Sequence, residues 1–120
     1  MAVEAMGNTI RMPQGDTGVV KFVPDKREIA SDDRALFTVV NRSGATLLRK
    51  VLSPDDDGVF RLPFVYDDTA RMKPDTYEWS IRVVHNATLD ASGKIVSVDT
   101  MHTPVTLGKM VVLTVAGGAR

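Results

Sequence analysis

Alternation of apolar and polar residues with a period of two is the feature that most limits what this chain can fold into. It is clearest around Tyr77, Trp79, Ile81 and Val83, which are separated by polar residues. A β-strand places alternate side chains on opposite faces, so these four side chains should share one buried face. No segment of about ten or more residues shows a sustained i, i+3, i+4 apolar stripe, so a helical domain is not expected.

Other segments of the same kind lie between turn-forming residues. We expect strands over 17–23, 35–40, 46–52, 59–66, 77–83, 94–100 and 106–115. Turns are expected at Asn41–Gly44 and Asp55–Gly58, and polar connections over 25–33 and 67–75. About seven or eight short strands with turns every 8–12 residues or so are typical of all-β domains. We therefore predict an antiparallel β-sandwich or a small barrel.

A chain of 120 residues and 13.1 kDa has the size of one domain. We expect a single β-sandwich domain in which residues 1–10 form an N-terminal arm and residues 116–120 fray. The arm is apolar for a free terminus, with Met6 and Ile10 among its residues, which indicates that it docks on a surface.

Composition excludes several classes of function. Without cysteine the chain has no disulfide, thiolate zinc site, iron–sulfur cluster or cysteine nucleophile. Fifteen Lys and Arg balance fifteen Asp and Glu, so we expect no nucleic-acid partner. The longest apolar region, Met110–Ala116, is far shorter than the roughly 20 residues that span a bilayer. The N-terminus lacks the basic and apolar regions of a secretory signal, so we expect a soluble protein with no membrane partner.

Two histidines are the main candidates for catalysis. His85 or His102 could combine with Ser80 or Ser97 and with Asp99, but no strained nucleophile turn or Gly-x-Ser-x-Gly pattern is present. Each histidine also fits an ordinary position at the end of a strand or in a connection. We predict no catalytic residues and a protein that is not an enzyme.

The acidic runs are the main candidates for a metal site. Asp55–Asp57 and the pair Asp67 and Asp68 lack the alternating ligands and the later glutamate of a calcium loop. Solvated loops that discourage wrong strand pairing explain them more simply. The glycines are scattered at turns and form no phosphate-binding loop. We predict no metal and no cofactor, with an incidental divalent ion at either acidic run as the alternative.

The aromatic residues separate into a core group and an exposed group. Five fall on strand faces that also carry aliphatic residues and are assigned to the core: Phe22, Phe37, Phe60, Tyr77 and Trp79. Pro63 cannot donate to a strand ladder, which predicts an edge strand or a bulge. Phe64 and Tyr66 follow Pro63 at the end of this predicted strand and are the aromatic residues that we expect to be exposed. The predicted interaction residues are therefore Met6, Ile10, Pro63, Phe64 and Tyr66.

The segment Met72–Trp79 carries a more specific structural motif. An apolar anchor is followed by a turn at Pro74 and by Tyr77 at the entry to a strand. In immunoglobulin-like sandwiches a tyrosine at such a corner donates its hydroxyl hydrogen to the backbone of the preceding loop. We expect the same contact here, although Asp75 stands where a glycine is usual.

The order of these motifs along the chain resembles that of a known group of domains. The motifs are Gly15–Thr17, Phe37–Val40, Leu47–Lys50, Asp67–Thr69, Pro74–Ile81, Gly93–Val98 and Pro104–Leu107. From about Arg11 to Val115 the chain resembles the small immunoglobulin-like β-sandwich domains encoded in tail and baseplate regions of phages and prophages. The chain is similar to the N-terminal domain of phage baseplate upper proteins, and this resemblance implies an immunoglobulin-like antiparallel β-sandwich. The chain departs from the family at Asp75-Thr76, where members have a glycine before the strand tyrosine.

The resemblance implies a non-enzymatic structural or interaction module of a phage virion, in the tail, the baseplate or on the capsid. It would be produced in the host cytoplasm and would assemble with itself or with other virion proteins, as a homo-oligomer or as part of a larger assembly. The alternative is a module that binds carbohydrate or a cell surface through a coplanar patch containing Phe64, Tyr66 or Trp79. We predict instead that Trp79 is buried. A hydrolase built on His85 or His102 has the least support.

Overall fold

The computed structural model describes residues 3–22, 33–85, 88–92, 95–97 and 100–114 and is mostly β. Its main element is a six-stranded mixed sheet with the strand order β1-β2-β10-β7-β4-β5. In that order the strands are β1 (Glu4–Met6), β2 (Thr9–Pro13), β10 (Thr100–Leu113), β7 (Asp75–His85), β4 (Arg34–Val40) and β5 (Thr46–Leu52). The prediction of an all-β fold is confirmed.

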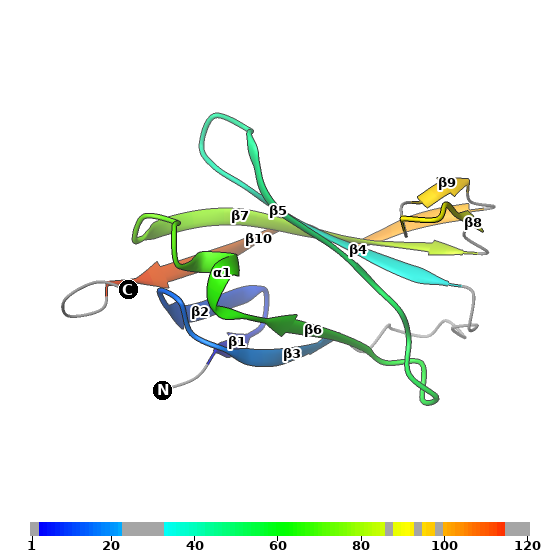
Figure 1. The fold of residues 1–120 in the computed structure, drawn as a ribbon, viewed down its shortest axis with the longest axis horizontal. Coiled ribbons are helices and arrows are strands. Elements are labelled where there is room, and N and C mark those ends of the chain that lie inside the picture. Colours follow the sequence, from blue (N-terminus) through cyan, green and yellow to red (C-terminus); the bar gives the residue numbers. More distant parts are fainter. Residues whose placement is uncertain (1–2, 23–32, 86–87, 93–94, 98–99, 115–120) are drawn as a thin grey trace.

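Two smaller sheets and a short helix complete the described structure. β3 (Gly18–Phe22) pairs antiparallel with β6 (Phe60–Phe64), and β8 (Thr88–Leu89) pairs with β9 (Ile95–Ser97). The helix α1 (Tyr66–Thr69) follows β6 directly. The β3–β6 pair lies opposite the sheet that contains β7 and β4, with α1 at one end of the intervening space (Figure 1).

Aromatic side chains from both layers form the centre of the core. Phe37 of β4 lies between the layers, with ring centroids 5.6 Å from Trp79 of β7 and 6.1 Å from Phe64 of β6. Phe22 of β3 lies 5.6 Å from Trp79. These rings join the two sheets, and Trp79 is buried as predicted.

The layers also touch along both edges. At one edge the ammonium group of Lys50 on β5 donates a hydrogen bond of 2.6 Å to the carbonyl of Pro63 on β6. At the other edge the side chain of Val3, next to β1, lies against Gly18 of β3. The space between the sheets is therefore bordered by protein on both sides.

The predicted strands agree with the described ones over most of their length. Alternate residues of β7 from Tyr77 to Val83 are buried, as the period of two indicates. We expected a strand over 59–66, but β6 ends at Phe64. The helix α1 begins at Tyr66 and continues into the segment 67–75, which we predicted as a polar connection. Among the described strands β6 pairs only with β3, which confirms the edge position predicted from Pro63.

The N-terminal segment is a correction to the sequence analysis. Residues 4–6 and 9–13 do not form an arm but two strands of the main sheet, and β2 pairs parallel with β10. This parallel pair makes the sheet mixed instead of wholly antiparallel. Ile10 and Met12 are alternate residues of β2, and both are buried in the core. The segment is therefore apolar because it contributes to the core, whereas we had interpreted its apolar residues as those of a docking arm.

Some expectations concern residues outside the described ranges. They include the connection over 25–32 and the terminal segment 116–120. They also include residues 1–2 of the predicted arm and residues 23, 94, 98, 99 and 115 of the predicted strands. Among the described residues no helix is long and apolar enough to cross a membrane.

Candidate functional site

The five predicted interaction residues divide between surface and core. Met6 is 84% exposed and Tyr66 44% exposed, and Pro63 is also exposed. Phe64 is 2% exposed, so the expectation that it lies on the surface is wrong. Ile10, which we assigned to a docking arm, is 1% exposed and lies in the core. Met6, Pro63 and Tyr66 are accessible to a partner, and their role in binding stays a prediction.

The burial of Phe64 follows from the alternation that predicted the fold. Phe60, Leu62 and Phe64 are the alternate residues of β6 and all face the core. Pro63 leaves this alternation intact, because the register with β3 runs without a shift from Phe60 to Phe64. Phe64 and Trp79 are both buried, and they are two of the three residues on which the carbohydrate-binding hypothesis depended.

An apolar stripe lies on the outer face of the β3–β6 pair. Val19 is directly opposite Pro63 in the register, and both side chains are exposed. Val65, two residues further along the chain, is 53% exposed, and Val19 is 56% exposed. Tyr66 follows Val65 at the start of α1. We call Val19, Pro63, Val65 and Tyr66 the outer stripe. Sequence reasoning missed both valines, although the alternation in 17–23 places the side chains of Val19 and Val20 on opposite faces of the strand.

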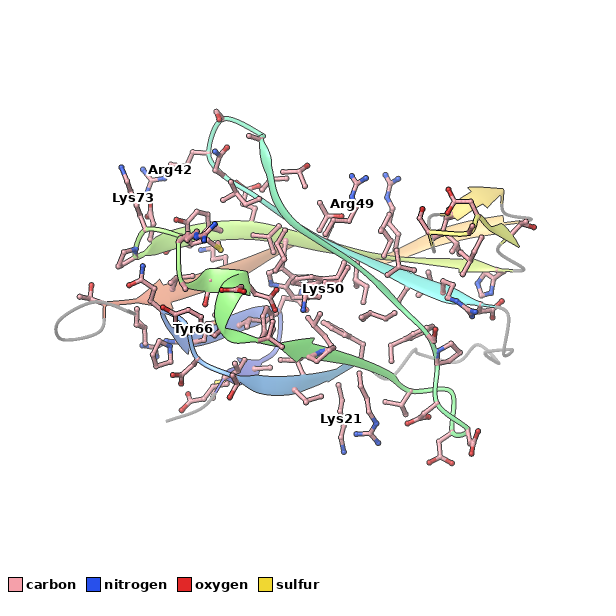
Figure 2. All side chains as sticks on the ribbon, viewed as in Figure 1. Lys21, Arg42, Arg49, Lys50, Tyr66 and Lys73 are labelled. Carbon is pink, nitrogen blue, oxygen red and sulfur yellow. The ribbon has the colours of Figure 1, made fainter. Side chains whose placement is uncertain are left out.

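Basic side chains adjoin the outer stripe. Lys21 and Arg61 are the next exposed pair along the same two strands. Lys21 projects away from the six-stranded sheet (Figure 2). Arg61 is held at its position by an ion pair of 3.2 Å with Asp55. The outer face of this small sheet therefore combines an apolar centre with a basic end.

A second surface feature is a cavity of about 470 Å³ between the β4–β5 turn and the segment that joins α1 to β7. Its walls include Leu47, Met72 and the ring of Tyr77. Arg42 and Lys73 both line it and lie near one another (Figure 2). We call it the basic cavity.

The tyrosine corner predicted from the sequence forms one wall of the basic cavity. The hydroxyl of Tyr77 donates a hydrogen bond of 2.6 Å to the carbonyl of Lys73, which confirms the expected contact. Burial raises the pKa of Tyr77, and the nearby charge of Asp75 raises it further, so the hydroxyl stays protonated and able to donate. This fixes the chain between Lys73 and Tyr77 against β7.

A further cavity of about 520 Å³ adjoins Met6 at the edge of the main sheet. It is lined by residues of β1 and β2, which are Glu4, Ala5, Met6, Thr9 and Arg11. β1 pairs with β2 and with no other described strand, so its outer edge is open in the described structure.

The acidic runs have structural partners within the chain. Oδ1 of Asp55 accepts hydrogen bonds from the backbone N–H groups of Asp57 and Val59. The pKa of Asp55 is lowered, chiefly by the hydrogen bond from Val59. Desolvation opposes this shift, and the hydrogen bond from Asp57 and the charge of Arg61 add to it. Asp68 accepts from the backbone N–H of Val65 at 2.8 Å. Within the described residues no group of three or more acidic or histidine side chains could hold a metal ion.

His85 has an acidic partner that sequence reasoning missed. Its Nδ1 lies 3.0 Å from Oδ2 of Asp33, a buried carboxylate at the start of β4. The pair arises because β4 and β7 run antiparallel, which brings the beginning of one strand beside the end of the other. His102 lies in β10, opposite Val83 of β7. Asp99, the acid considered for catalysis, lies outside the described residues.

The chain was compared with protein-family models, with curated proteins and with solved structures. None of the three comparisons finds a match.

Proposed function

We propose that this chain is a non-enzymatic interaction module that belongs to a phage virion, in the tail, the baseplate or on the capsid, and that it is assembled through protein–protein contacts. The observation that carries the proposal is the outer stripe. It places the exposed Val19 and Pro63 side by side on the outer face of the β3–β6 pair, and the exposed Val65 and Tyr66 follow Pro63 directly along the chain. The virion setting comes from the sequence resemblance described above.

The composition of the outer stripe suits a protein partner. Contact surfaces are enriched in aromatic residues and in arginine at their centres, and exposed apolar patches on small proteins mark interaction sites. Val19 and Pro63 are held in register by the strand ladder, so little side-chain or backbone freedom is lost when a partner binds. A covering partner would remove three apolar side chains from water together.

An immunoglobulin-like fold is part of the same proposal. Taken in chain order, β3, β4, β5, β6, β7 and β10 correspond to strands B, C, C′, E, F and G of that fold. The pairing order β10-β7-β4-β5 then corresponds to G-F-C-C′, and β3-β6 corresponds to B-E. Tyr77, near the start of β7, stands where the conserved tyrosine of strand F forms its corner bond.

The proposal is tested by measuring the chain in purified virus particles from a strain that carries its gene. We expect quantitative mass spectrometry to find the wild-type chain in the particles and cross-linking to join the outer stripe to a virion protein. The double variant Val19→Lys/Val65→Lys should enter particles at least about tenfold less well, because the contact would lose two valine side chains that the partner covers. The matched control is Val51→Lys, an exposed valine of β5 on the other layer.

Each other outcome counts against a defined part of the proposal. Absence of the wild-type chain from all particles contradicts the virion role. Equal incorporation of Val19→Lys/Val65→Lys and Val51→Lys contradicts the outer stripe as the contact surface. Thermal unfolding of all three proteins provides the check on folding, since the substituted side chains are exposed.

A further inference from the structure

The basic cavity carries positive charge that the fold itself does not use. Its rim includes Arg42, Arg71 and Lys73. Arg42 forms an ion pair of 3.2 Å with Asp75. Arg71 and Lys73 are exposed, and the described residues offer neither of them an ion-pair partner. An apolar wall with unpaired cations at the rim is suited to an acidic segment that also brings backbone or aliphatic surface.

The chain itself carries a segment of that chemistry in the turn Asp55–Gly58. Asp56 and Asp57 are exposed at the tip of this turn. Asp55 holds the turn in one shape, because its side chain accepts two backbone hydrogen bonds and also pairs with Arg61. Gly58 adopts a φ of 75°, which favours glycine, and its N–H donates to the carbonyl of Asp55. A rigid turn loses little conformational entropy on binding.

The basic cavity and the acidic turn lie toward opposite ends of the described structure (Figure 1). The described chain is elongated, with principal extents of 46 × 25 × 24 Å. In Figure 1 the connection from β5 to β6, which contains Asp55–Gly58, lies toward one end of the long axis, and the connection from α1 to β7 lies toward the other. The turn therefore cannot occupy the cavity of its own chain.

We propose that the basic cavity of one copy receives the Asp55–Gly58 turn of a second copy, so that copies associate head to tail. The inference rests on the proposed function, because it names a second copy of this chain as one assembly partner. Arg71 and Lys73 would face Asp56 and Asp57 of the neighbour. Such a contact joins two different surfaces, so it generates a closed ring or an open filament instead of a symmetric dimer.

The first experiment is sedimentation velocity over a range of protein concentrations at about 0.02 M and about 0.5 M salt. We expect the sedimentation coefficient to rise with concentration at low salt, and the rise to be largely lost at high salt, because exposed charges are screened within about 3–10 Å there. Arg71→Gln/Lys73→Gln and Asp56→Ser/Asp57→Ser should each weaken self-association about tenfold or more. The matched control Arg49→Gln/Lys109→Gln neutralises two exposed basic residues outside the cavity and should associate like the wild type.

A mixing experiment separates head-to-tail association from other kinds. Each double variant keeps one intact surface: the first keeps its acidic turn and the second keeps its cavity. Neither should associate alone, and an equimolar mixture should form dimers that contain one copy of each variant and grow no further. A mixture that stays monomeric, or that grows beyond dimers, overturns the proposal.

Two more outcomes also overturn it. One is a wild-type chain that stays monomeric at low salt up to about millimolar concentration, where even weak contacts are populated. The other is a cavity that binds inorganic phosphate in calorimetry while neither double variant changes self-association. Failure here is distinguishable from failure of the proposed function, because a chain found in virus particles but monomeric in solution loses only the head-to-tail contact. A self-associating chain absent from all particles loses only the virion role.

Discussion

At the scale of single residues, Trp79 has the most constrained surroundings in the core. Its Nε1 donates a hydrogen bond of 3.0 Å to the carbonyl of Lys109, and its ring packs against Phe22 and Phe37. The face toward β10 meets Gly108, where a Cβ atom would lie only 2.2 Å from Cε2 of the indole. Gly108 therefore lets two neighbouring strands accept a ring that no larger residue would admit.

Replacing Gly108 by Ala should destabilise the protein by about 2 kcal/mol or more, because the buried indole cannot move away without leaving its partners. Urea unfolding measures this change. In a Trp79→Leu background the same replacement should cost markedly less, since the shorter side chain leaves room for the new methyl group. Equal costs in the two backgrounds would show that the contact with Trp79 is not the cause.

Phe64 shows how far sequence reasoning reaches at this scale. The presence of Pro63 led us to expect a disturbed edge at which the aromatic residues after the proline, Phe64 and Tyr66, are exposed. A proline at an edge strand removes only its own N–H, and the alternation of Phe60, Leu62 and Phe64 continues past it. The period of two was the stronger signal, and it would have placed Phe64 in the core had it been applied consistently.

At the scale of elements, Lys50 connects β5 to the opposite layer. Its ammonium group lies 2.7 Å from a carboxylate oxygen of Asp68 in α1 and also donates to the carbonyl of Pro63. It lies 5.8 Å from the ring centroid of Phe64, within the range of a cation–π contact. Figure 2 shows Lys50 in the region between β5 and α1. The side chain of Lys50 thus links β5 to both β6 and α1.

Replacing Lys50 by Met keeps the length of the side chain but removes its charge, so Asp68 loses its cation in a largely shielded site. We expect a loss of about 2 kcal/mol in the free energy of unfolding, less than for a fully buried pair because both groups retain some solvent contact. Asp68→Asn keeps an acceptor for the N–H of Val65. The double variant Lys50→Met/Asp68→Asn should therefore cost less than the sum of the single changes, and additive costs would argue against coupling.

Most strands and turns were predictable because their signals are local. Asn41 accepts bonds from the N–H groups of Ser43 and Ala45, as expected of an asparagine that begins a turn. The helix α1 was missed because four residues are too few to show a period of 3.6. Asp67 and Asp68 in its first turn were a usable signal, since negative charge is favourable at a helix N-terminus, but we interpreted them only as a loop.

At the scale of the whole molecule, the parallel pairing of β2 with β10 joins two distant parts of the sequence. Met110 lies opposite Ile10 in the register and Val112 opposite Met12, and all four side chains are buried. The apolar alternation predicts that each segment has a buried face. It contains no information on which strand will be its neighbour or on the direction of pairing, and for that reason the segment 1–10 was interpreted as an arm.

This arrangement predicts a sharp contrast between two apolar residues of the former arm. Ile10→Ala should lower the free energy of unfolding by about 3 kcal/mol, because it leaves a cavity against Met110 in the core. Met6→Ala should change it by less than about 0.5 kcal/mol, because that side chain is 84% exposed. Urea unfolding followed by Trp79 fluorescence compares the two. A small effect of Ile10→Ala would mean that β2 can detach while the rest of the sheet stays folded, as an arm would, whereas a large effect makes it a permanent strand of the domain.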